Sequence, residues 1–244
     1  MKRFCVLNIG NTHTQEAVAQ LADNNEFEWV EYRKYDTSEI PFGEFPVNIF
    51  TVYASVVPQL TEVMKKKFPQ SLACVAENVP FIDFSAAPPT LGMDRIANCA
   101  ALIQKNPDGI IVDSGTAITL EVVNNKKFIG GAILPGTGIL ARAMHDYTGA
   151  LPLVQCNEVP SLESIVPETL TVKAMEIGIQ SAAVAGTLQL LDNFLSILPE
   201  KSPVYVCGGN RQSILNQRAD LLNGGNDFTL NGLAEVAKYY LNKE

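Results

Sequence analysis

Short apolar runs that end in a glycine-containing turn occur twice along the chain. Val6–Thr12 reads VLNIGNT and Ile111–Ala117 reads IVDSGTA, and each begins with the kind of apolar run that forms a strand before a turn. Asn8 and Asp113 occupy matching places, 105 residues apart. The repeat predicts two similar lobes with a cleft between them.

Both copies continue in the same way. Asp23-Asn24-Asn25 follows the first copy and Asn124-Asn125 follows the second, each between two strand-like segments. Because asparagine and aspartate favour turns, a hairpin is predicted after each copy. Glycine lets the backbone approach a ligand closely, and nearby amides and small hydroxyls could surround phosphate oxygens. The two glycine turns are therefore predicted to be phosphate loops.

The rest of the chain alternates helical and strand-like segments, which is typical of a mixed α/β protein. Helices are predicted at 59–68, 91–104, 172–198 and 230–241 and from 139 to 145, and strands at 48–56 and 204–206. The break at Pro88-Pro89 separates a predicted N-terminal lobe, 1–87, from a predicted C-terminal lobe, 88–244.

Composition narrows the functional classes. The 244 residues, 47% hydrophobic and 18% charged, suit a globular protein, and no apolar run approaches the length of a membrane span. A net charge of −8 opposes nonspecific nucleic-acid binding, and Lys65-Lys66-Lys67 is typical of a solvated helix face. Five cysteines without a C-x-x-C pair suit reduced thiols. We expect a cytoplasmic protein with no nucleic-acid or membrane partner.

The segment LGMDRIAN, at Leu91–Asn98, places an acid and a base side by side at the start of a predicted helix. Asp94 could accept a proton from a substrate hydroxyl, and Arg95 could orient a substrate by charge-assisted hydrogen bonds. Taken alone, the pair fits a structural role better, as a favourable first-turn acid and its surface partner. Asp113 and Thr116 are open to similar structural interpretations, as a strand-end acid and a β-forming residue.

Taken together, the motifs resemble the type III pantothenate kinase family over nearly the whole chain. NIGNT, ASVVPQLT, LGMDRIAN, VDSGTAITLEVV, FIGGAILPG and TVKAMEIGIQSAAVAG follow one another at similar spacings. LGMDRIAN matches the family's G-x-D-R, and VDSGTAIT matches its D-x-G-T-A-x-T. The resemblance implies the fold of the actin and sugar-kinase superfamily, with two related ribonuclease H-like α/β lobes that bind ATP in the cleft between them. The chain has neither a Walker-type P-loop nor G-x-G-x-x-G, which agrees with this fold.

The resemblance further implies ATP-dependent phosphorylation of pantothenate to 4′-phosphopantothenate, the first committed step toward coenzyme A. It implies a homodimer, magnesium with ATP, and a monovalent cation, potassium or ammonium. Asp94 would be the proton acceptor, and Asp113 would hold the monovalent cation. Pantothenate would contact Gly92, Met93, Asp94, Arg95 and Thr171. ATP would contact Asn8, Ile9, Gly10, Asn11, Thr12, His13, Thr14, Gln15 and Thr116.

The chain departs from the family pattern at several places. Asn8 replaces the aspartate of the usual D-x-G-N-T, so the loop keeps a carbonyl oxygen but loses a charge. Cys207 stands where a threonine or serine commonly precedes the late glycine pair, and Phe84 and Ser85 stand where a tyrosine often lies near pantothenate. Two alternatives stay open: a catalytically weakened regulatory or binding member of the family, and another superfamily enzyme such as a sugar kinase or a polyphosphate hydrolase.

Overall fold

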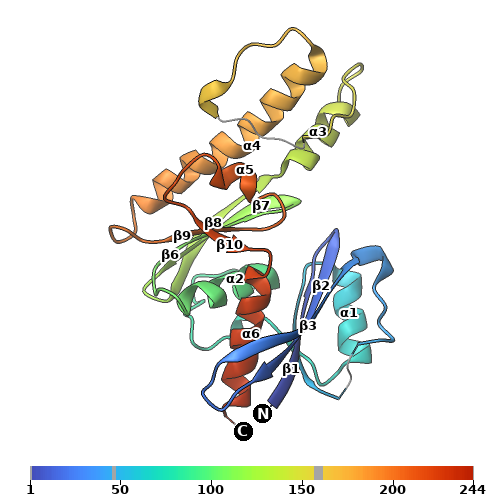
Figure 1. The fold of residues 1–244 in the computed structure, drawn as a ribbon, viewed down its shortest axis with the longest axis vertical. Coiled ribbons are helices and arrows are strands. Elements are labelled where there is room, and N and C mark those ends of the chain that lie inside the picture. Colours follow the sequence, from blue (N-terminus) through green and yellow to red (C-terminus); the bar gives the residue numbers. More distant parts are fainter. Residues whose placement is uncertain (1, 46–47, 157–161, 244) are drawn as a thin grey trace. The chain divides into compact units, whose positions relative to one another are not determined.

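The computed structural model describes residues 2–45, 48–156 and 162–243, which form two compact units, each with its own five-stranded sheet (Figure 1). The first unit comprises 1–107, 125–129 and 227–244, and the second comprises 108–124 and 130–226. These units differ in extent from the predicted lobes, because the segments 88–107 and 227–244 belong to the first unit by their contacts. The predicted lobe boundary after residue 87 stays a prediction.

The sheet of the first unit has the strand order β3-β2-β1-β4-β5. Its strands are β1 (Lys2–Ile9), β2 (His13–Leu21), β3 (Phe27–Asp36), β4 (Phe50–Ser55) and β5 (Leu72–Ala73). The pairs β1–β2 and β2–β3 are antiparallel, whereas β1–β4 and β4–β5 are parallel. β1 is central, and its apolar residues Phe4, Val6 and Ile9 are fully buried.

Helices cover the two faces of this sheet. α1 (Pro58–Lys67) begins at a proline, which is favoured at a first helical position, and its Met64 packs into the cluster with Cys5 and Leu7. α6 (Phe228–Leu241) packs against β1 and β4, and α2 (Met93–Ile103) packs against α6 (Figure 1).

The crossing of α2 and α6 is very close. A Cβ atom on Gly232 of α6 would lie 1.8 Å from the Ala97 carbonyl oxygen of α2, so only glycine allows this approach. Nearby, the buried Thr229 Oγ1 donates a hydrogen bond to Asn98 Oδ1 at 2.8 Å. This crossing fixes α2, which carries Asp94 in its first turn.

The sheet of the second unit repeats the arrangement of the first, with the order β10-β9-β6-β7-β8. Its strands are β6 (Gly109–Ser114), β7 (Ala117–Asn124), β8 (Lys127–Pro135), β9 (Val204–Cys207) and β10 (Leu222–Gly225). The pair β6–β7 is antiparallel, and β6–β9 and β9–β10 are parallel, as in the first sheet. The sequence repeat therefore corresponds to a repeat of topology.

One face of this second sheet forms a core with α4 (Thr171–Leu195) and α5 (Gln212–Leu215). Ile110, Val112 and Leu120 are buried in that core. α3 (Thr137–Asp146) packs on α4 through a separate small cluster. The described residues also form the short 3₁₀ turns η1 (Thr37–Glu39), η2 (Ala76–Asn78) and η3 (Leu162–Ser164).

The predicted hairpins are confirmed. Asn25, between β2 and β3, and Asn125, between β7 and β8, have φ values of 66° and 50°, the left-handed conformation that asparagine tolerates better than most residues. The predicted helices correspond to α1, α2, α3, α4 and α6, although α4 ends at Leu195, short of residue 198. Among the described residues, no helix combines the length and hydrophobicity needed to cross a bilayer.

Candidate active site

The first glycine turn joins β1 to β2 and is closed by its own backbone. The Gly10 amide donates to the His13 carbonyl oxygen at 3.0 Å. A Cβ atom on Gly10 would lie 2.9 Å from that same oxygen, which explains the glycine. Asn11, Thr12 and His13 are exposed at the tip. The turn thus presents short polar side chains and backbone amides to solvent.

Thr37, 25 residues after Thr12 in the sequence, stabilises this turn by hydrogen bonds. The Thr37 amide donates to the Thr12 carbonyl oxygen at 2.9 Å, and Thr37 Oγ1 donates to the Gly10 carbonyl oxygen at 2.8 Å. Thr14 is fully buried, and its hydroxyl lies 3.1 Å from Thr37 Oγ1. Sequence reasoning missed Thr37, and it assigned Thr14 to ATP without foreseeing that its side chain holds the turn from inside. Ile9 is likewise fully buried, so only its backbone could contact a ligand.

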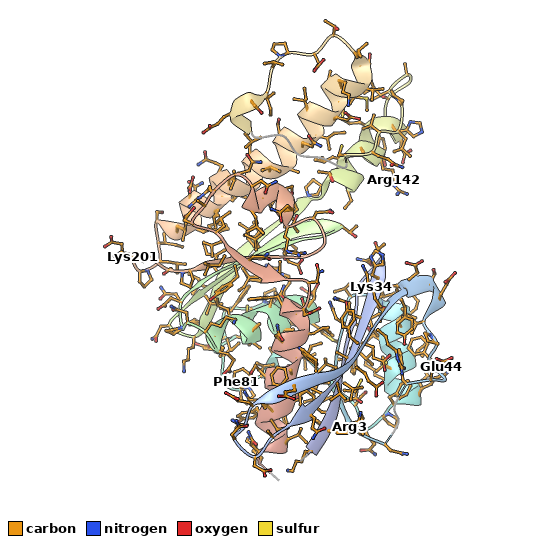
Figure 2. The ribbon with its side chains drawn as sticks, in the orientation of Figure 1. Arg3, Lys34, Glu44, Phe81, Arg142 and Lys201 are labelled. Atoms are coloured by element: carbon orange, nitrogen blue, oxygen red, sulfur yellow. The ribbon has the colours of Figure 1, made fainter. Side chains whose placement is uncertain are left out.

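A chain of neutral polar groups leads from the end of β1 across the sheet. Asn8 Nδ2 donates to Gln15 Oε1 at 3.4 Å, and Gln15 Nε2 donates to Tyr32 OH at 3.0 Å. Asn8 Oδ1 has no hydrogen-bond partner among the described residues and stays available to a ligand. Lys34, the cross-strand neighbour of Gln15 on β3, is exposed and supplies a positive charge to this part of the strand (Figure 2).

The second glycine turn joins β6 to β7 and is packed against the start of α3. The Gly115 amide donates to the Ala117 carbonyl oxygen at 3.0 Å, and the Gly136 amide donates to the Thr116 carbonyl oxygen at 3.1 Å. A Cβ atom on Gly136 would lie 2.5 Å from that Thr116 oxygen. The side chain of Thr116 itself is exposed. Gly136, the last residue of the FIGGAILPG motif, therefore sets the distance between the turn and α3.

Asp113 lies at the end of β6, beside the glycine pair that follows β9. Gly208 has φ +87°, and a Cβ atom there would lie 2.4 Å from Asp113 Oδ1 and 2.6 Å from the Ser114 carbonyl oxygen. The Asn210 amide donates to that Ser114 oxygen at 2.8 Å. A carboxylate and a carbonyl oxygen thus converge on a place that a side chain would fill.

A cavity of about 450 Å³ opens next to this turn, within the second unit. Its walls combine polar groups with the apolar side chains of Ile118, Ala183 and Val184. The other lining residues are Ser114, Gly115, Gly136, Thr137, Cys156, Gly209, Asn210, Gln212, Ser213 and Asn216. The volume falls within the range of small-molecule sites. Several of these residues lie in motifs that the sequence analysis selected, whereas Gln212, Ser213 and Asn216 lie in none of them.

Asp94 is the second residue of α2, after Gly92 at the N-cap and Met93 at the first helical position. Its Oδ1 accepts a hydrogen bond from the Arg95 amide at 2.8 Å. Burial raises the pKa of Asp94 above its usual range, although that hydrogen bond and the Arg95 charge act in the opposite direction. The guanidinium carbon of Arg95 lies 6.0 Å from the centre of the Phe128 ring, a cation–π contact that orients the side chain.

The predicted site residues are divided between the two units. Asn8–Gln15 and Gly92–Arg95 belong to the first unit, and Asp113, Thr116 and Thr171 belong to the second. Thr171 is exposed at the first position of α4. Within the described ranges, no group of three or more histidine, cysteine, aspartate or glutamate side chains could hold a metal ion. Magnesium that arrives with ATP needs no such cage, since phosphate oxygens and water supply most of its ligands.

The fold defines the class of protein first. A conserved Campylobacter jejuni protein, proposed to be a Baf family transcriptional activator, has a similar structure, with a TM-score of 0.67, 22% identity, and coverage of 98% of this chain and 99% of that chain. A Listeria monocytogenes protein proposed to be an N-acetylmannosamine kinase is similar with a TM-score of 0.53 and 12% identity, over 99% and 100% of the two chains. These two structures and the repeated sheet topology confirm the predicted fold class, α/β with two related lobes.

Sequence comparison then gives the family. The model for type III pantothenate kinase matches residues 4–192. The type III pantothenate kinase of Thermosynechococcus vestitus is 38% identical over 146 residues, 59% of this chain and 55% of that relative. The one of Christiangramia forsetii is 26% identical over 241 residues, 96% and 97% of the two chains. The type III pantothenate kinase of Nostoc sp. is 31% identical over 181 residues, 72% of this chain and 62% of that relative. Two of these three matches therefore cover less than two thirds of the relative's length. The chain belongs to the type III pantothenate kinase family.

Proposed function

We propose that this protein transfers the γ-phosphoryl group of ATP to the terminal hydroxyl of pantothenate, giving 4′-phosphopantothenate in the first committed step toward coenzyme A. The observation that carries the proposal is Asp94, a carboxylate of raised pKa in the first turn of α2, within the G-x-D-R motif of a chain that belongs to this family. A raised pKa brings the carboxylate closer to the pKa of an effective general base, which lies near the operating pH.

In the proposed reaction, Asp94 accepts the hydroxyl proton of pantothenate as that oxygen attacks the γ-phosphorus. The new oxygen–phosphorus bond forms while the bond from the γ-phosphorus to the β,γ-bridging oxygen breaks, and ADP leaves. Arg95 pairs with the pantothenate carboxylate and holds the acceptor in line, with Gly92, Met93 and Thr171 as further contacts. Positioning and charge neutralisation contribute more than covalent chemistry in such a transfer.

The residues of the two turns would hold the phosphates. The exposed tip of the first turn and the Thr116 hydroxyl offer donors to phosphate oxygens, and Asn8 Oδ1 offers an acceptor to magnesium or its water. Asp113 would hold the monovalent cation, which is supported by the convergence of its Oδ1 and the Ser114 carbonyl oxygen beside Gly208. When bound, the cations would offset the negative charge of the phosphates during transfer.

The 450 Å³ cavity is the proposed place of the nucleoside. It adjoins the second turn through Ser114 and Gly115, so a nucleotide could lie with its phosphates at the turn and its base within the cavity. The apolar walls suit the flat face of a base, and Gly209 allows close approach.

We also propose a homodimer formed through α4. Leu170 and Val172, at the start of this helix, are 65% and 43% exposed, and Gly178, Ala182 and Ala185 leave small exposed positions along it. Exposed apolar residues grouped in this way mark an interaction surface. Light scattering that shows only monomer at micromolar concentration would contradict the dimer. The five cysteines are free thiols, which supports a cytoplasmic location.

The proposed function is tested by incubating the purified protein with ATP, magnesium, potassium and pantothenate. ADP should form only when pantothenate is present, and 4′-phosphopantothenate should appear in equal amount. Absence of turnover by folded protein, with potassium or with ammonium, would overturn the proposal. The same assay with hexoses and with polyphosphate examines the alternative of another superfamily enzyme.

The alternative of a weakened regulatory member gains no support from the comparisons. The match to the proposed transcriptional activator is only 22% identical and shows the fold alone. The alternative rests on Asn8, and Asn8→Asp tests it: a very large gain in turnover would support impairment, whereas a small change would show that asparagine suffices.

A further inference from the structure

Two carboxamides lie at the rim of the cavity, on and just after α5. Gln212 and Asn216 both line it, both are exposed, and Gln212 Nε2 donates to Asn216 Oδ1 at 2.5 Å. Two neighbouring polar side chains make hydrogen bonds elsewhere: Ser213 Oγ donates to the Asn210 carbonyl oxygen at 2.7 Å, and Asn210 Nδ2 donates to the Gly115 carbonyl oxygen at 3.4 Å.

The carboxamide pair keeps hydrogen-bonding capacity on its outer side. Once Gln212 Nε2 and Asn216 Oδ1 have bonded to each other, Gln212 Oε1 remains as an acceptor and Asn216 Nδ2 as a donor. Neither of these two atoms has a further partner among the described residues. A neighbouring acceptor and donor match the edge of a purine, where adenine offers N6–H and N1, and guanine offers N1–H and O6.

The pair can also run in the opposite direction. If both amides rotate by half a turn, Asn216 donates to Gln212, and the donor and acceptor that face the cavity exchange places. Adenine and guanine differ at this edge in the same way, since the hydrogen-bond donor of one base stands where the other base has its acceptor. A pair that can reverse therefore satisfies either base at equal cost.

We propose that Gln212 and Asn216 bind the hydrogen-bonding edge of the nucleotide base, and that their reversible pairing lets the site accept adenine and guanine nucleotides alike. This inference rests on the proposed function in one respect, that the cavity holds the nucleoside. It adds the two residues that set the base preference. It also names the class of phosphoryl donor, a purine nucleoside triphosphate.

Asn216→Asp fixes the direction of the pair. An ionised carboxylate only accepts hydrogen bonds, so it favours the adjacent N1–H and N2–H donors of guanine and repels the N1 lone pair of adenine. The matched control is Asn193→Asp. Asn193 accepts a hydrogen bond from Gln189 at 3.3 Å in the same i, i+4 arrangement on exposed α4 positions, and neither residue lines the cavity.

Calorimetric titration of the magnesium complexes of the β,γ-imido analogues of ATP and GTP measures base preference without catalysis. We expect the unsubstituted protein and Asn193→Asp to bind the two analogues with dissociation constants within about threefold of each other. Asn216→Asp should favour the guanine analogue by about tenfold or more, the size of discrimination that a good paired contact to a base provides.

The possible results separate this inference from the proposed function. An unchanged ratio in Asn216→Asp, or a preference beyond about tenfold for one base in the unsubstituted protein, would overturn the inference. Tight binding of both analogues without turnover of ATP or GTP on pantothenate would overturn the proposed function and leave the inference supported. Binding of neither analogue would overturn both.

Discussion

Asn8 lies directly opposite Gln15 across the β1–β2 pair, and its side-chain amide donates to Gln15 Oε1. Gln15 in turn donates to Tyr32, so the amide nitrogen of Asn8 is held within the sheet while its Oδ1 remains available. A neutral oxygen therefore stands where the family motif carries a carboxylate. The first turn therefore has one negative charge fewer than the family motif.

We predict that Asn8→Asp lowers the magnesium concentration needed for half-maximal rate by roughly fivefold, with less change in kcat. A carboxylate at about 4 Å adds on the order of 1 kcal/mol of attraction for a cation in water. Initial rates across a magnesium titration measure the effect. Asn11→Asp, at the exposed tip of the same turn, is the control; an equal shift in both variants would mean that added charge, and not the position of Asn8, is responsible.

Asp94→Asn should lower kcat by about 10² to 10⁴, the usual contribution of a general base, and change the KM for pantothenate much less. The exposed Asp83→Asn is the control on the same unit and should keep full rate. Steady-state kinetics with varied pantothenate separate the two parameters. Equal activity of the two variants would contradict the assigned role.

The same substitution should not lower stability. Because burial raises the pKa of Asp94, the folded protein binds a proton more tightly than the unfolded chain does, and this group stabilises the fold less as pH rises through the raised pKa. Asp94→Asn removes a partly buried charge at neutral pH, so its Tm should equal or exceed that of the unsubstituted protein. A clear loss of Tm would indicate a structural role for the carboxylate.

The pH dependence of turnover follows from the same pKa. Asp94 must be ionised to accept a proton, so kcat/KM for pantothenate should fall as pH decreases through a value above the ordinary aspartate pKa of about 4. A pH–rate profile with a buffer-independent acid limb measures this value. A flat profile down to pH about 4 would contradict the assignment.

Gly208→Ala should reduce activity by at least about tenfold and cost roughly 1–3 kcal/mol of stability, because a side chain there requires an unfavourable φ and displaces Asp113. Gly209→Ala is the adjacent control for stability and for the potassium response, since a Cβ atom at that position meets nothing within 4 Å in the protein. Potassium titrations should show a weaker response in Gly208→Ala only. An equal potassium response of the two variants would contradict a role of Gly208 in the cation site.

Gly232→Ala should be strongly destabilising, by about 3 kcal/mol or more, since the added methyl group collides with the Ala97 backbone and must separate α2 from α6. Gly138→Ala, in the first turn of α3, meets nothing within 4 Å and should be neutral or slightly stabilising. Thermal unfolding of both variants by circular dichroism compares them. A Tm of Gly232→Ala within a few degrees of the parent would contradict the close crossing.

The sequence predicted the fold well where local pattern decides structure. Several local signals each mark an element or turn that the structure confirms: the apolar runs, Asn25, Asn125 and the proline at the start of α1. Local pattern predicted neither α5 nor β10, because each has only four residues and is too short to show a helical or strand period.

The candidate site was predictable only in its conspicuous motifs. NIGNT, LGMDRIAN and VDSGTAIT carry distinctive residues, so Asp94 and Asp113 could be selected. The roles of Thr37 and Gly136 depend on backbone contacts made across 25 and 20 residues of sequence, and neither residue type is unusual in its own segment. The burial of Thr14 could not be predicted from the sequence either. A threonine in a polar turn can face solvent as readily as it can pair with a buried hydroxyl, as Thr14 does with Thr37.

The most direct test of the proposed phosphoryl transfer is the formation of ADP and phosphopantothenate by the purified protein with ATP, magnesium and potassium. We expect the two products in equal amounts, dependent on pantothenate and lost in Asp94→Asn. ADP formed at the same rate without pantothenate, or full phosphopantothenate formation by Asp94→Asn, would contradict the account.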